Sequence, residues 1–150
     1  MFISILRSQN KTNVTNEVRQ NATLAIDLFE RDVRSARGIN PAGTGNLVEL
    51  EEADNGTSVD WECVVAVPGN AANGYIKRTV GGVGQVITNQ EPKTGVSIDC
   101  TTNPTFDVSS STTPIVTMRF NALQGEKAPG RADYRVNLPF ETTVGVRDFN

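Results

Sequence analysis

The most regular pattern in this 150-residue sequence is the stretch Ala22-Thr-Leu-Ala-Ile-Asp-Leu-Phe-Glu-Arg-Asp-Val-Arg-Ser-Ala36. Its apolar residues mostly recur every three or four positions, which is the period of an α-helix with one buried face. Together with two valines further upstream, this apolar stripe consists of Val14, Val18, Ala22, Ala25, Ile26, Phe29, Val33 and Ala36. We expect the part at 22–37 to pack against the rest of the chain, with Phe29 as its largest side chain.

The N-terminal region, residues 1–38, is predicted to form one long helix over residues 2–37. Neither Gly nor Pro occurs before Gly38, and a glycine is common just beyond the end of a helix. About 36 residues would form a rod of roughly 54 Å, which a domain of this size cannot cover along its whole length.

The two halves of this helix differ in polarity. The segment 2–6 is apolar nearly all round, residues 7–20 are polar, and the stripe becomes dense only from Ala22. The start is either a frayed helix end or, as we favour, the end of a transmembrane helix. We expect an assembly surface for a neighbouring subunit in this half, made of Phe2, Ile3, Ile5, Leu6, Val14 and Val18.

Residues 39–150 have the texture of an antiparallel β domain. Short alternating runs follow one another every 8–12 residues, separated by turn residues, and they predict roughly seven strands. The last run, Tyr134 to Phe149, contains Pro139, which indicates either an edge strand or a break in the strand. A helix followed by strands predicts an α+β fold, with an antiparallel sheet packed on the helix in one structural domain.

Composition excludes most kinds of catalytic and metal site. The chain has no histidine, which rules out Ser-His-Asp triads and His-ligated metals. The formal net charge of −3 argues against a nucleic-acid partner, because binding phosphates requires a basic surface. No stretch reaches 18 apolar residues. We therefore predict no enzyme activity, no cofactor and no metal, and a structural or binding role.

The two cysteines, Cys63 and Cys100, both fall on the apolar phase of a predicted strand. This placement favours a disulfide, which would stabilise the fold by about 3–4 kcal/mol and indicate a compartment outside the reducing cytosol. The alternative is two buried free thiols, which behave as small hydrophobic side chains.

Two further motifs favour hairpins. The run Gly81-Gly82-Val83-Gly84 lacks the residues of a phosphate-binding loop and is typical of a turn. Acidic residues gather at 49–62 around Asp54-Asn55-Gly56, which predicts a second hairpin. A solvated acidic hairpin is the favoured interpretation of this cluster, and a Ca²⁺ site is the alternative.

The end of the predicted helix resembles a known family. The stretch from Val18 to Gly38 is similar to the pattern alkyl-acid-x-x-x-x-Asp-hydrophobic-Arg-x-Ala of J-type pseudopilins and W-type minor pilins. The run Tyr75-Ile-Lys-Arg78 and the end of the chain, Phe140 to Asn150, also resemble those families, and the middle of the chain does not take part. The transmembrane half-helix that opens such proteins is absent from this sequence.

The resemblance implies a structural subunit of a type IV pilus or a type II secretion pseudopilus. Its partners would be other pilin or pseudopilin subunits. The inner membrane would hold it through an N-terminal segment, with the β domain in the periplasm or outside the cell. The alternative function is a cell-surface adhesin or carbohydrate-binding module on a helical stalk, with Trp61, Tyr75 and Tyr134 as contact aromatics. Against it, Trp61 falls on the apolar phase of its strand, which favours a place in the core.

Overall fold

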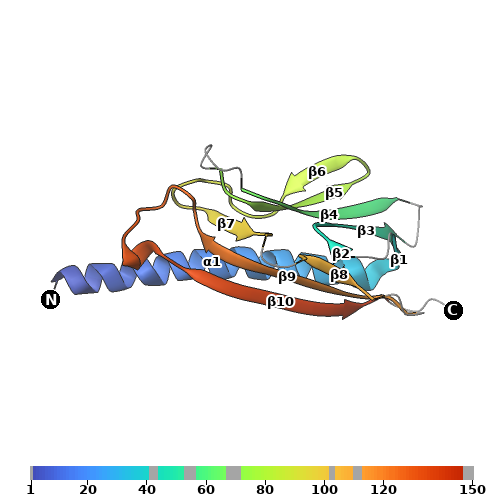
Figure 1. Cartoon of the computed structure of the whole chain (residues 1–150), viewed down its shortest axis with the longest axis horizontal. Coiled ribbons are helices and arrows are strands. Elements are labelled where there is room, and N and C mark those ends of the chain that lie inside the picture. Colours follow the sequence, from blue (N-terminus) through green and yellow to red (C-terminus); the bar gives the residue numbers. More distant parts are fainter. Residues whose placement is uncertain are drawn as a thin grey trace.

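The computed structural model describes residues 2–40, 44–52, 57–66, 72–101, 104–109 and 113–146, without the side chains of Phe2 and Thr44. One long helix, α1 (Phe2–Ser35), lies against antiparallel β-sheet (Figure 1). The predicted α+β fold is therefore confirmed. The described strands form two sheets, whereas the sequence analysis expected one.

The first sheet has five strands in the order β1-β3-β4-β5-β6. Every neighbouring pair in it is antiparallel. Its strands are β1 (Ala36–Asn40), β3 (Leu47–Glu52), β4 (Ser58–Val64), β5 (Tyr75–Val80) and β6 (Val83–Val86).

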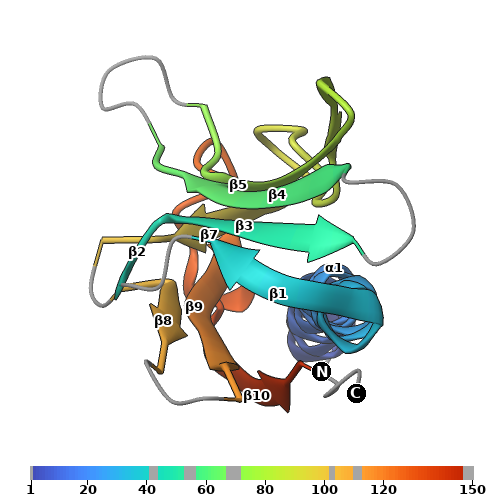
Figure 2. The ribbon, with the colours of Figure 1, turned by 90° about the vertical axis from the view of Figure 1, so that its right-hand side faces the viewer.

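The second sheet is built around the long strand β9. One edge of β9 pairs with β10 along nine residues, while β8 and β7 pair in turn with its other edge. The strands are β2 (Thr44–Gly45), β7 (Val96–Asp99), β8 (Phe106–Val108), β9 (Ile115–Gln124) and β10 (Asn137–Gly145). A 3-10 turn, η1 (Ala132–Tyr134), precedes β10. Seen nearly end-on, α1 lies in the angle between the two sheets (Figure 2).

The helix ends earlier than predicted. It was expected to run to Arg37 with Gly38 just beyond it, but it ends at Ser35 and the chain enters β1 directly. From Ala36 the backbone pairs with β3 in place of a further helical turn. Arg37 forms a bulge between the paired residues Ala36 and Gly38. Ala36, expected on the helix, is still fully buried, but from a strand.

The alternation along the strands was predicted correctly. Val59, Trp61 and Cys63 of β4 are buried, and the residues between them are partly exposed. The predicted edge strand with Pro139 is confirmed, since β10 is the last strand of its sheet. Gly81 and Gly82 form the turn between β5 and β6 with positive φ angles, as the hairpin required. The predicted turn at 54–56 lies outside the described residues.

The short strands β1, β2 and β8 were not predicted. They span two to five residues and lack a recognisable alternation, and they form because longer neighbours offer backbone partners. The last strand was predicted over 134–149. It begins only at Asn137, because Tyr134 belongs to η1, and the end of the predicted range lies outside the described residues.

Candidate functional site

The start of α1 is uncovered by the rest of the described chain. Residues 3–9 are all exposed, and this part of the helix extends beyond the sheets (Figure 1). Three apolar side chains lie there, with exposed fractions of 65% for Ile3, 56% for Ile5 and 44% for Leu6. We call these three residues the apolar tip. Phe2, predicted for the same surface, belongs to α1, but its side chain is outside the described part.

The prediction for Val18 was wrong. Its side chain is fully buried within its own chain, so it cannot be a surface for a neighbouring subunit. Val14 is half-buried and packs against the same core. The packed part of the helix therefore begins about two turns earlier than the predicted residue 22, because β7, β9, β10 and η1 all reach α1.

The stripe predicted to face the sheet does so. Ala22, Ala25, Phe29 and Val33 are fully buried, and Ile26 is partly buried against the core. The ring of Phe29 packs edge-on against Trp61 of β4, with centroids 5.4 Å apart. It also contacts Phe106 of β8 at 5.5 Å. Phe29 thus joins the helix to both sheets at one point, where aromatic contacts add to the burial of apolar surface.

A buried polar group on the helix was missed by the sequence analysis. Asp32 is only 7% exposed. It accepts hydrogen bonds from Trp61 Nε1 at 2.8 Å and from Arg78 Nε at 2.6 Å and Nη2 at 3.0 Å. The bond to Asp32 raises the pKa of Arg78, against desolvation, which lowers it. The helical period held the signal, since Asp32 stands three residues after Phe29 on the packed face.

The segment around η1 contacts α1 through polar side chains at Asn10 and Lys11. Asn10 donates to Asp133 Oδ2 at 3.2 Å, and the ammonium of Lys11 donates to the carbonyl of Arg135. Arg131 forms an ion pair with Asp133 at 2.8 Å and lies over the ring of Tyr134. We call these contacts the clasp. Desolvation raises the pKa of Asp133, but hydrogen bonds from Asn10 and Arg131 outweigh it and leave this pKa below its ordinary value.

The predicted disulfide is present. Cys63 and Cys100 are bonded, with Cα atoms 6.0 Å apart, and both are buried. Cys63 belongs to β4 of the first sheet, and Cys100 directly follows β7 of the second. The bond therefore ties the two sheets together as well as closing a loop of the chain.

The described parts of the acidic hairpin, residues 49–52 and 57–62, show no arrangement that favours a metal. Glu49 pairs with Asp60 across β3 and β4, and Glu51 lies 4.0 Å from Arg37. Within the residues that the structure describes, no group of three or more His, Cys, Asp or Glu side chains could hold an ion. Nothing here supports the calcium alternative.

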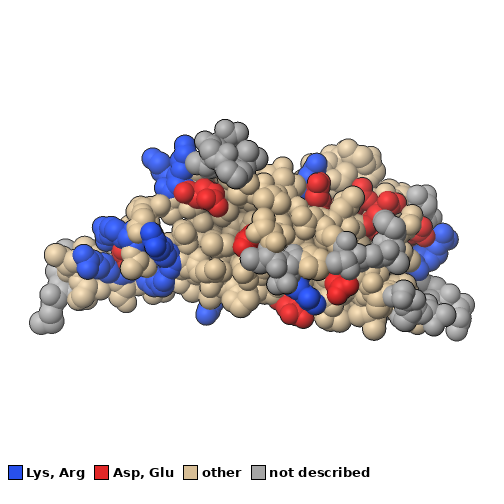
Figure 3. Space-filling model, viewed as in Figure 1, with Lys and Arg blue, Asp and Glu red and all other residues tan. Residues whose placement is uncertain are grey.

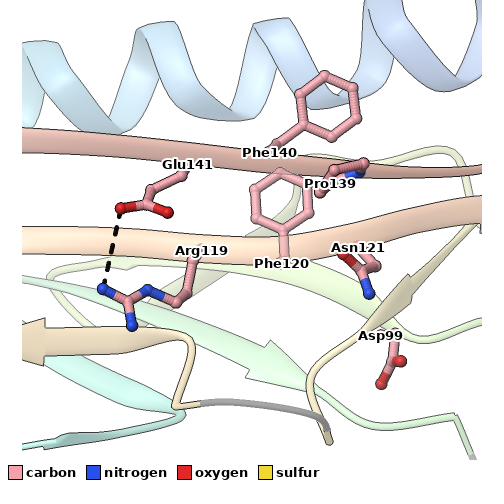
Figure 4. Close-up of a pocket in the computed structure, with 7 residues that line it drawn as sticks. All are labelled: Asp99, Arg119, Phe120, Asn121, Pro139, Phe140 and Glu141. Carbon is pink, nitrogen blue, oxygen red and sulfur yellow. Dashed lines mark ion pairs between the residues drawn. The ribbon is translucent and has the colours of Figure 1, made fainter.

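A pocket of about 330 Å³ lies on β9 and β10 (Figure 4). Arg119 and Glu141 face each other at its border, 3.9 Å apart, and Asp99 and Asn121 lie on the side of β7. Phe120 and Phe140 stack on each other across the two strands. The Arg119–Glu141 separation is too long for a hydrogen bond, and the buried Nε of Arg119 has no hydrogen-bond partner in the described chain. One unpartnered N–H beside two stacked rings does not define a ligand.

The aromatics of the alternative binding site are not brought together at the surface. Trp61 is fully buried, with its indole N–H bound to Asp32, which confirms the core position that its apolar phase predicted and removes it as a contact residue. Tyr75 lies on β5 and Tyr134 in η1 of the clasp, and both are partly exposed. A second pocket of about 310 Å³ is lined in part by Tyr134. No other aromatic residue is among the described residues that line it.

Among the described residues, no helix is both long enough and apolar enough to cross a bilayer. No family model matches the chain, and neither a curated protein nor a solved structure shows significant similarity to it.

Proposed function

We propose that this protein is a structural subunit of pilin or pseudopilin type that assembles with other subunits through α1. The observation that carries the proposal is the apolar tip, which projects uncovered from a helix whose other half is packed into a small β domain. Exposed apolar side chains gathered at one end of a rod are typical of an interaction surface. The resemblance of residues 18–38 to pilin-like helix ends supports the same role.

The packed half of α1 also keeps one face free. Gln20, Leu24, Asp27 and Arg31 follow each other at helical spacing and are all exposed. Leu24 is half exposed although it lies in the best-packed part of the helix. A bundle of neighbouring helices would cover this outer face, and burying such side chains would drive assembly without any chemical reaction.

The proposal includes a location in the cell envelope and attachment to the inner membrane through an apolar segment ahead of the tip. The disulfide supports a domain outside the cytosol, because such bonds persist in oxidising compartments.

Site-specific photo-crosslinking in cells tests the assembly surface. A photoreactive amino acid at Ile5 or Leu24 should give crosslinks to other subunits, because both positions lie on the free surface of α1. The matched control is Leu47, which is 58% exposed at the start of β3 and off the helix. Crosslinks from Leu47 alone would reject α1 as the assembly surface.

A charge substitution gives the second measurement. Leu24→Asp should impair assembly while leaving the melting temperature of the domain unchanged, because the side chain is half exposed in the free subunit. Leu47→Asp should leave assembly intact. Normal assembly of a stable Leu24→Asp protein would contradict the proposal.

A further inference from the structure

Basic side chains surround the start of α1, although the whole chain is acidic. The formal net charge is −3. Figure 3 nevertheless shows lysines and arginines gathered over the beginning of the helix, while acidic side chains are more frequent toward its other end. We call Arg7, Lys11, Arg131 and Arg135 the basic collar, and all four are exposed.

Contacts from two distant parts of the sequence bring the collar together. Arg7 and Lys11 are one helical turn apart on the same face of α1. Lys11 binds the carbonyl of Arg135, and Arg131 is held beside Asp133 of the same segment. Asp133 is the one acid in these contacts, which leaves the cluster with an excess of positive charge.

Three members of the collar, Arg7, Lys11 and Arg135, form no ion pair within the described chain. Lys11 donates to a carbonyl, whereas Arg131 pairs with an acid. Unpaired cations on the surface of an acidic protein are available to an anionic partner.

The apolar tip lies next to the collar. Ile5 precedes Lys11 by six residues, which is about 9 Å along the helix axis. The headgroup layer on each side of a bilayer is about 5–8 Å thick, from the difference between its full and hydrocarbon dimensions. An apolar end followed by cations at this spacing matches the boundary between lipid chains and headgroups.

We propose that the apolar tip and the basic collar together form a surface for an anionic lipid bilayer. The tip enters the boundary of the acyl chains, and the guanidinium and ammonium groups of the collar contact lipid phosphates. The inference deepens the proposed function, on which it rests for the orientation of α1 toward a membrane. Nucleic acid would also attract the collar, but it offers nothing to the apolar tip.

Vesicle flotation with the purified 150-residue chain tests this surface. The chain should bind vesicles of equal parts phosphatidylglycerol and phosphatidylcholine but not vesicles of phosphatidylcholine alone, and salt should weaken the binding. Arg7→Gln with Arg135→Gln should weaken it about 25-fold, since each cation near the surface contributes about five-fold. Ile3→Ser with Leu6→Ser should weaken it about ten-fold or more.

Two matched pairs control for charge and for apolar surface. Arg31→Gln with Arg37→Gln removes the same charge from the other end of α1, and Leu47→Ser with Val83→Ser removes exposed apolar side chains from the first sheet. With either control pair, the affinity for anionic vesicles should stay within about two-fold of the wild-type value. The reason is that only cations close to the membrane surface contribute about five-fold each. Thermal melts check that every variant is folded.

Three results would overturn the inference. These are equal binding to neutral and anionic vesicles, an equal loss in the control pairs, and binding to duplex DNA that needs the collar but not the tip. The two proposals fail separately. If Ile5 and Leu24 give no crosslinks in cells although the chain binds vesicles, assembly through α1 is rejected. If they give crosslinks although the chain does not bind vesicles, the lipid surface is rejected.

Discussion

The first turns of α1 and the part from Val14 to Val33 belong to one continuous helix but have opposite environments. The first has every described side chain exposed up to Gln9, including the apolar tip. The second buries a full stripe against two sheets and places Asp32 in the core. The helix therefore continues beyond the part that the sheets cover, and the clasp at Asn10 and Lys11 marks the boundary. The difference separates side chains that hold the fold from side chains that remain for partners.

Phe29→Ala should have the largest effect on this contrast. It removes the ring that contacts both Trp61 and Phe106, and truncation of a buried aromatic costs about 3–5 kcal/mol. Leu24→Ala on the same helix is the control and should cost about 1 kcal/mol or less, because Leu24 is half exposed. Denaturant unfolding measures both. Equal losses would mean that the two faces of α1 are not distinct.

Asp32→Asn should have the next largest effect on the free energy of unfolding. The amide can still accept from Trp61, but it leaves the guanidinium of Arg78 without its counter-charge in a site only 23% exposed. Breaking a buried pair from one side costs about 3 kcal/mol or more. Asp27→Asn on the exposed face should change the free energy of unfolding by less than about 0.5 kcal/mol. If the two variants unfold alike, the ion pair adds nothing to the packed half.

Acid should open the clasp. The folded-state pKa of Asp133 is lowered, so its stabilising contribution is present above the unfolded pKa of about 3.9 and is lost as the pH falls through the lower folded value. The protection factors of the amides near Asn10 should then fall below about pH 4, while amides around Phe29 stay protected. In Asp133→Asn the exchange near Asn10 should lose this pH dependence. If the amides near Asn10 of the wild-type protein are as poorly protected at neutral pH as at acidic pH, the clasp does not mark the boundary between the two parts of α1.

Asn13→Ala should have the smallest effect. Asn13 is exposed beyond the packed stripe, and alanine is the better helix former, so stability should stay level or rise by a few tenths of a kcal/mol. Asn21→Ala is the matched control, because Asn21 accepts from the backbone of Asn89 at 2.8 Å and donates to Glu17. It should be destabilising in the same thermal melts. A loss at position 13 as large as that at position 21 would place Asn13 inside the packed region.

Local patterns predicted much of the fold and part of the candidate site. Spacing alone identified Phe29, Val33 and the alternating residues of β4, because the helical and strand periods determine which side chains share a face. The inward phase of Cys63 and Cys100 was enough to predict their bond. The exposed positions Ile3, Ile5 and Leu6 were predicted because a rod of this length exceeds its domain.

The errors arose where distant segments meet. Val18 was assigned to a partner because the stripe is sparse there, yet it is fully buried in a helix that packs against β7, β9, β10 and η1 from far along the chain. The helical period places Asp32 on the packed face, but its partners Trp61 and Arg78 come from β4 and β5, so its own segment does not identify them. The basic collar was missed for the same reason, because Lys11 and Arg135 are 124 residues apart.

The sequence by itself determined the long helix, its apolar stripe, the inward phase of the strands and the absence of histidine chemistry, since these depend on neighbouring residues and on composition. Only the tertiary structure decided where coverage of the helix begins, how the strands divide into two sheets, and which charges meet at Asp32 and at the collar. Coverage and charge pairing depend on the return of β9, β10 and η1 to the helix, and no local period encodes that return.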